Sequence, residues 1–233
     1  MNTSAESVPD DALGVSSWEV TQETEVEFGG LGWTVLPSVY PMHLVRSSEF
    51  FRRQLSALPP VHSFLEVGCG AGALSVLAVK NGLCQEATGV DVNPNALAAS
   101  QMNARRHGVE DATTFVYSDV FDAVSDSQFD LIFWNSNGAL PDSGEILDED
   151  ATISHHERAI FDPGYASHLR YLEQGRNRVR PGGRLLIGFC GNGDLGFIKE
   201  KAASLGLSLE LLATDDEGSH PHYLLEIRET SPA

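Results

Sequence analysis

The feature that most constrains this chain is a glycine-rich turn between a short apolar run and a helical segment. The turn occupies residues 68–72 and has the sequence Gly-Cys-Gly-Ala-Gly; residues 64–67 before it are predicted to form a buried strand and residues 73–80 a helix. Such a strand–turn–helix offers free backbone N–H groups and a positive helix end to an anion. Asp91 follows near the tip of a second predicted strand, where its carboxylate can accept hydrogen bonds from two ribose hydroxyls. The sequence therefore predicts an α/β fold whose ligand contains a ribose.

Two cofactor classes fit the glycine pattern. Gly68, Gly70 and Ala73 satisfy the dinucleotide motif G-x-G-x-x-G/A, and Asp91 stands at about the spacing of its ribose-binding acid. This motif alone therefore leaves a nicotinamide-binding domain possible.

Three further features distinguish the two classes. Glu66 immediately precedes the glycines, Asp119 follows a third predicted strand at residues 113–117, and Asn135 ends a fourth at residues 129–134. Together they resemble the Rossmann-like, class I S-adenosylmethionine (SAM) methyltransferases, whose motif is E/D-x-G-x-G-x-G. In that superfamily the acid after the third strand binds the adenine amino group, and the reactive centre lies at the end of the fourth strand.

The resemblance implies a seven-stranded, mostly parallel Rossmann-like sheet with helices on both faces and an antiparallel last strand. The order of the predicted segments agrees, because strand and helix alternate along most of the chain. Two consecutive strands, residues 208–214 and 222–228, are predicted at the end.

Within the superfamily, residues 31–227 are most similar to amino-methyltransferases with an N-P-P-Y/F motif, such as the release-factor glutamine methyltransferases. The matching positions here are Asn135-Ser136-Asn137-Gly138, so the asparagine is present and both prolines and the aromatic residue are replaced. The resemblance implies that Asn135 orients a substrate amine. An alternative follows from the azetidine-2-carboxylate synthases of this fold, in which the SAM amino group attacks its own γ-carbon and releases methylthioadenosine. In a third interpretation, Asn135 only caps the end of its strand.

The resemblance also implies a set of site residues. The residues expected to bind the cofactor SAM are Glu66, Gly68, Cys69, Gly70, Gly72, Asp91, Val92, Asp119, Val120 and Asn135. Tyr40 and Ser136 are expected to bind the substrate. The predicted catalytic residues are Asn135, Trp134, Tyr165 and Tyr171. Asn135 is chosen for its position at the end of its strand, and the three aromatic residues because an aromatic ring near a sulfonium adds about 0.5–2 kcal/mol of cation–π attraction.

Composition limits the partners. Asp and Glu number 33 against 15 Lys and Arg, and the net charge of −18 disfavours a DNA or RNA substrate. Apolar runs fall short of the ~20 residues that span a bilayer, so no membrane partner is expected. The three cysteines lack zinc-ligand spacing and fit a reducing cytoplasm. No metal is expected, because His220-Pro221-His222 is a weak metal signal without Cys, Asp or Glu at ligand spacing. The pair His155-His156 falls in the predicted lid, where a histidine could deprotonate an amine, but a solvated loop is the favoured interpretation.

Three regions are predicted along the chain: a disordered acidic tail at residues 1–17, a hairpin and helix module at residues 18–60, and a SAM-binding domain at residues 61–233 with a lid at about 136–162. Ser47 or Ser48 is predicted to cap the helix of the module. The predicted function is a cytoplasmic SAM-dependent methyltransferase that acts on a small-molecule acceptor, an amine or amino-acid-like compound. The alternatives are intramolecular cyclisation of SAM and a non-catalytic SAM-binding module.

Overall fold

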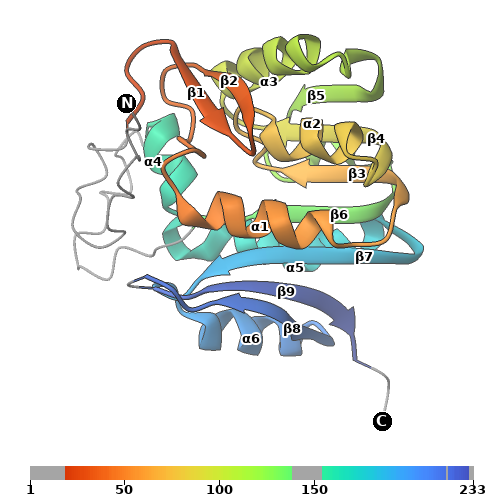
Figure 1. Cartoon of the computed structure of the whole chain (residues 1–233). Helices are drawn as coiled ribbons and strands as arrows, with labels where there is room; N and C mark the ends of the chain where they lie inside the picture. Colours follow the sequence, from red (N-terminus) through yellow and green to blue (C-terminus); the bar gives the residue numbers. More distant parts are fainter. Residues whose placement is uncertain (1–18, 138–153, 219, 231–233) are drawn as a thin grey trace.

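The computed structural model describes residues 19–137, 154–218 and 220–230. In these ranges the chain forms one seven-stranded sheet with helices on both faces and a separate two-stranded hairpin (Figure 1). The predicted acidic tail and most of the predicted lid lie outside the described residues. The domain boundary predicted near residue 60 falls between the first helix and the sheet, and this division of the chain stays a prediction.

The order of strands confirms the predicted fold class. The sheet has the order β5-β4-β3-β6-β7-β9-β8. Its strands are β3 (Val61–Val67), β4 (Cys84–Asp91), β5 (Thr113–Tyr117), β6 (Phe129–Asn135), β7 (Val179–Cys190), β8 (Leu207–Asp215) and β9 (His222–Glu229). The pairs from β5 through to β7 are all parallel, whereas β9 is antiparallel to both β7 and β8. The last strand therefore inserts antiparallel between its two neighbours.

Two layers of helices cover the sheet. The longer helices are α1 (Arg46–Ser56), α2 (Ala73–Lys80), α3 (Pro94–His107), α5 (Ala166–Gly175) and α6 (Leu195–Ser204). Alternate residues of the central strands face opposite layers: Phe64 and Phe133 pack with α1 and α2, and Leu65 and Ile132 pack with α5 and α6. Because both faces are covered, the central strands are continuous apolar runs.

The hairpin formed by β1 (Thr24–Phe28) and β2 (Leu31–Val35) docks onto the glycine-rich turn. Gly29 and Gly30 have positive φ angles of 60° and 76°, as a two-residue hairpin turn requires. The buried side chain of Asn103, on α3, accepts a hydrogen bond from Thr34 N at 2.9 Å and donates to Thr34 O and to Ala71 O. This one amide ties the hairpin and α3 to the turn.

The predicted cap of α1 is wrong. The helix begins at Arg46 after an extended Val45, which makes no side-chain cap, so Ser47 and Ser48 lie inside the first turn and are buried. The helix starts earlier than predicted because the chain turns at residues 41–45, where Leu44 N donates to Pro41 O at 2.9 Å. The three short elements η4 (Pro163–Tyr165), η3 (Asp122–Val124) and α4 (His155–Ile160) complete the region around the carboxyl ends of the strands.

We predict that Gly188→Ala lowers the free energy of unfolding by about 1–3 kcal/mol, because it overpacks the contact between β7 and α1. A Cβ on Gly188 would lie 2.7 Å from Phe51 Cε2, on a ring that is itself buried. Gly32→Ala is the matched control, since a Cβ there meets nothing within 4 Å. Urea denaturation of both variants measures the difference, and equal midpoints would contradict the tight packing.

Candidate active site

A cavity opens at the carboxyl ends of β3, β4 and β6, where the order of strands reverses. Open α/β sheets bind ligands at this place. Most of the site residues predicted from the sequence line it: Tyr40, Glu66, Gly68, Cys69, Asp91, Val92, Asp119, Val120, Trp134, Asn135 and Ser136. The four that do not line it are Gly70, Gly72, Tyr165 and Tyr171.

Glycine is required at these positions of the turn for different structural reasons. Gly68, Gly70 and Gly72 all have positive φ angles, of 63°, 54° and 78°. Gly68 borders the cavity, where a Cβ would lie 3.2 Å from Trp134 Nε1. Gly72 instead packs against α3, where a Cβ would lie 2.6 Å from the Cβ of Ser100. Its role is therefore helix packing rather than the predicted contact with the cofactor.

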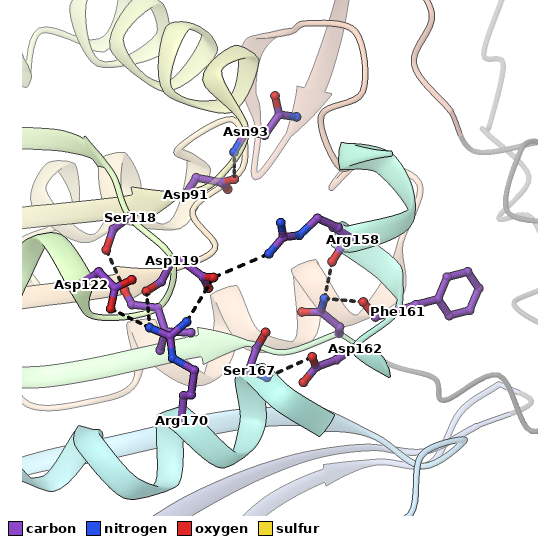
Figure 2. Close-up of polar contacts among 12 residues, drawn as sticks. Asp91, Asn93, Ser118, Asp119, Asp122, Arg158, Phe161, Asp162, Ser167 and Arg170 are labelled. Atoms are coloured by element: carbon purple, nitrogen blue, oxygen red, sulfur yellow. Dashed lines mark hydrogen bonds and ion pairs between the residues drawn. The ribbon is translucent and has the colours of Figure 1, made fainter. Parts of the chain in front are cut away.

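Asp91 holds the turn from the end of β4. Its Oδ2 accepts a hydrogen bond from Gly70 N at 2.9 Å. Its Oδ1 accepts one from Asn93 N at 2.8 Å (Figure 2). Burial raises the pKa of Asp91, against the effect of the N–H groups of Asn93, Gly70 and Val92. A carboxylate has about four lone-pair sites, so Asp91 can still accept from a hydroxyl donor. The part of Gly70 that acts here is its backbone N–H, which supports Asp91.

Glu66 is a second buried acid, next to the turn on β3. Its Oε2 accepts hydrogen bonds from the backbone N–H and the hydroxyl of Ser75, on α2. Burial raises the pKa of Glu66 to about 8, Ser75 opposes this rise, and the charge of Asp91 adds to it. A cationic group in the cavity would favour the ionised form of Glu66.

Asp119 lies after β5 and faces two arginines (Figure 2). Arg170, on α5, approaches Asp119 Oδ2 at 3.1 Å and also bonds Asp122 Oδ1 at 2.6 Å. Arg158, on α4, is farther from the same Oδ2, at 3.7 Å. Both cations meet Oδ2, which leaves Oδ1 for another donor. Val120 follows with a positive φ of 51°, which turns the chain away from the strand.

Two of the predicted catalytic aromatic residues belong to the core. Tyr171 is fully buried and donates its hydroxyl to Leu186 O at 2.7 Å. Tyr165 is 3% exposed, and its hydroxyl accepts a hydrogen bond from Asp194 N. Their hydroxyl groups serve the backbone, and neither residue lines the cavity, so we withdraw both as site residues.

A network of side chains that the sequence did not reveal lies directly behind Asn135. Ser136 Oγ donates to Gly188 O at 2.6 Å and meets His168 Nε2 at 2.9 Å, and His168 Nδ1 lies 2.6 Å from Asp162 Oδ2. The side chains of His168 and Asp162 are 0% and 5% exposed. Of these three residues the sequence predicts only Ser136 as a site residue, because no motif links His168 and Asp162 to it.

The prediction of a solvated loop at His155-His156 is also wrong. The two residues begin α4, His156 is buried, and His155 lines the cavity together with Arg158. Ser154 and Glu157 form a capping box, with Glu157 N donating to Ser154 Oγ at 3.1 Å. The S-x-x-E pattern was a usable signal for this helix start. Among the described residues, no group of His, Cys, Asp and Glu could hold a metal ion.

Known proteins with similar sequences are methyltransferases. A model of the methyltransferase small domain matches residues 36–136. The release factor glutamine methyltransferase of Geobacter sulfurreducens is 34% identical over 165 residues, which are 69% of this chain and 56% of that protein. The ribosomal protein L11 methyltransferase of Cupriavidus taiwanensis is 38% identical over 78 residues, 34% of this chain and 24% of that protein. The chain thus spans little more than half of the first relative and about a quarter of the second.

Solved structures share the fold. The tRNA m1G37 methyltransferase of M. jannaschii superposes with a TM-score of 0.63 at 16% identity, covering 92% of this chain and 59% of that one. The TrmK protein of M. capricolum, solved with S-adenosyl-homocysteine, has a TM-score of 0.56 at 15% identity and covers 77% and 68%. The fold is that of the class I, Rossmann-like SAM-dependent methyltransferases, and residues 36–136 match their small-domain model, so the predicted cofactor class is confirmed. No helix in the described part of the chain is long and apolar enough to cross a membrane.

We predict that Glu66→Gln removes a pH dependence from folding stability. Since the pKa of Glu66 is raised from 4.5 to about 8, the folded state binds more protons than the unfolded state between these values. The free energy of unfolding therefore falls as pH rises through this window, on the order of 3–5 kcal/mol in total. Urea denaturation across the window should show Glu66→Gln gaining stability relative to the wild type as pH rises. The exposed Glu86→Gln is the control, and parallel profiles for wild type and Glu66→Gln would refute the shift.

Proposed function

We propose that this protein is a SAM-dependent methyltransferase that transfers a methyl group to the nitrogen of a small, amino-acid-like acceptor. The observation that carries the proposal is the continuity of one cavity, which joins the glycine turn and three acids to Asn135. A ligand-binding half and a reactive half thus lie in a single space. When bound, SAM supplies a methyl group on a sulfonium, an excellent leaving group.

Each of the three acids is suited to bind a different part of SAM. Asp91 keeps lone pairs toward the cavity for the ribose hydroxyls, and Asp119 offers Oδ1 to the adenine amino group. The methionine part then lies along the turn at Gly68, where a side chain would meet Trp134. Glu66, buried and open to the cavity, is suited to an ammonium. The residues present therefore fit this cofactor.

Asn135 and Trp134 act at the reactive end. The side-chain oxygen of Asn135 accepts a hydrogen bond from the acceptor amine and turns its lone pair toward the methyl carbon, a contribution of alignment rather than of acid–base chemistry. The indole of Trp134 is 4% exposed and borders the cavity beside the turn, where it excludes water.

Arg158 supports an acceptor that also has an anionic group. It is the one Lys or Arg among the described residues that line the cavity. Its contact with Asp119 is long, at 3.7 Å, whereas Arg170 holds the same oxygen at 3.1 Å. Arg158 can therefore bind a carboxylate group of the acceptor with its planar guanidinium, while Arg170 remains paired with Asp119. The chain's net charge of −18 opposes a polyanionic RNA.

Incubation with SAM separates the candidate activities. Formation of S-adenosylhomocysteine only when a pool of amines and amino acids is added supports methyl transfer to an acceptor. Methylthioadenosine released from SAM alone would establish cyclisation instead. Tight SAM binding by calorimetry without turnover across acceptor pools would indicate a binding module. Methylation of a polypeptide but of no small molecule would contradict the acceptor class.

Asn135→Ala is expected to lower kcat by about 10²–10³-fold while the Kd for SAM changes little, since only alignment in the transition state is lost. Asn135→Asp is the sharper variant, because a carboxylate stabilises the acceptor as ammonium and its activity should recover as pH rises. Asn81→Ala, at an exposed asparagine outside the site, is the control. A wild-type kcat for Asn135→Ala would assign Asn135 to capping the strand.

Arg158→Gln is expected to raise the KM for an anionic amino acid acceptor about 10–100-fold, because a charge-assisted hydrogen bond contributes roughly 1.5–3 kcal/mol. The KM for the corresponding amine without a carboxylate should stay the same. Arg53→Gln, at a mostly exposed arginine of α1, is the control. Equal effects on both acceptors would exclude an anion contact at Arg158.

A further inference from the structure

Asp162, His168 and Ser136 form a chain of hydrogen bonds that ends beside Asn135, and we name it the Asp162 network. Asp162 lies between α4 and α5, His168 is on α5, and Ser136 is the first residue after β6. The network therefore connects the second helical layer to the end of the strand that carries Asn135. The proposed function does not use it.

Asp162 is the ionised end of the network. Its Oδ1 accepts from Ser167 N at 3.0 Å, and its Oδ2 accepts from His168 N at 3.0 Å and from His168 Nδ1 at 2.6 Å (Figure 2 shows the Ser167 contact). Burial alone would raise the pKa of Asp162, but the hydrogen bonds from His168 and Ser167 outweigh it and hold the pKa below its usual value. A carboxylate only accepts hydrogen bonds, so His168 Nδ1 carries a proton.

The hydroxyl group of Ser136 determines whether the second ring nitrogen of His168, Nε2, is a donor. Gly188 O can only accept, and it lies 2.6 Å from Ser136 Oγ, so the single hydroxyl proton points to this carbonyl. His168 Nε2, 2.9 Å from the same oxygen, must then be a donor. Both nitrogens of His168 therefore carry protons, and the ring is an imidazolium paired with Asp162. The Trp134 ring, with its centroid 4.7 Å away, is a suitable neighbour for this cation.

The same imidazolium contacts both chain neighbours of Asn135. It bonds Ser136 on one side and packs against Trp134 on the other. Trp134 in turn lies against the turn, where Gly68 leaves room for its indole. Ser136 is also held by its own N–H, which donates to Gly188 O at 3.1 Å. The backbone of Asn135 is thus fixed from both sides by contacts that lead to one ring.

We infer that His168 is a positioning residue, which as an imidazolium fixes Trp134 and Ser136 and thereby aims the Asn135 side chain at the acceptor nitrogen. The inference rests on the proposed function for its kinetic consequence but not for its structural one. A serine nucleophile activated by the same three residues is excluded by the proton count, because the hydroxyl proton of Ser136 points to Gly188 and not to His168.

The first test is NMR of the full chain labelled with 15N-histidine, near neutral pH. Both ring nitrogens of His168, assigned by their loss in His168→Gln, are expected at protonated shifts. A neutral ring with one unprotonated nitrogen would overturn the inference. The side-chain amide resonances of Asn135 are expected to shift or broaden in His168→Leu and to stay in place in His107→Gln. Unchanged Asn135 resonances in His168→Leu would also overturn it.

The second test is kinetic. His168→Leu is expected to lower kcat about 30–100-fold and His168→Gln less, because the Gln amide can still donate to Ser136, while the Kd for SAM stays within about threefold. His107→Gln is the matched control, since His107 likewise packs on a tryptophan, with ring centroids 4.4 Å apart, and bonds a backbone carbonyl. A wild-type kcat in His168→Leu would overturn the inference. Absence of turnover in the wild type would refute the proposed function alone, because the NMR results do not depend on activity.

Discussion

The structure depends on the reversal of strand order at β3. From β3 the chain builds the sheet outward through β4 to β5. It then returns to the other side of β3 and forms β6, so the connections after β3 and β6 leave the centre of the sheet in opposite directions. A cavity lined by described residues lies at the carboxyl ends of the strands at this point. Asp91 stabilises the exposed turn there, because its two oxygens bind backbone N–H groups on either side. The site residues that we retain are those that line this cavity.

Charge gives the cavity its preference for a cation. Burial and the proximity of Asp91 both raise the pKa of Glu66 to about 8, so near neutral pH the side chain of Glu66 is mostly in its neutral form. A cation bound beside Glu66 would lower this pKa and favour the ionised carboxylate. Arg158 adds a positive charge to the cavity wall, where it meets Asp119. The site thus separates a region that favours positive charge from one that favours negative charge.

The sheet and the acids at its strand ends were predictable because each depends on a local pattern: an apolar run followed by glycines, or by an acid. Asp162 and His168 were not, since they meet Ser136 only after α5 packs under β6, and this distance in sequence leaves no local signal. Two of the aromatic residues predicted for the site, Tyr165 and Tyr171, lie in the core instead. Tyr171 has the helical spacing of a core residue, and the backbone carbonyl of Leu186 satisfies its hydroxyl inside the core.

The strand end at Asn135 shows how hydrogen bonds can replace covalent stiffness. In the N-P-P-Y motif that this segment resembles, two proline rings fix the backbone after the asparagine. Here Ser136 and Asn137 occupy those positions, and each is anchored by its side chain: Ser136 to Gly188 O, and Asn137 to the backbone oxygens of Arg158 and Phe161. A proline is rigid by itself, whereas these anchors exist only while α4, α5 and β7 are in place. The geometry at Asn135 is therefore coupled to the packing of α4, the helix that also supplies Arg158 to the cavity.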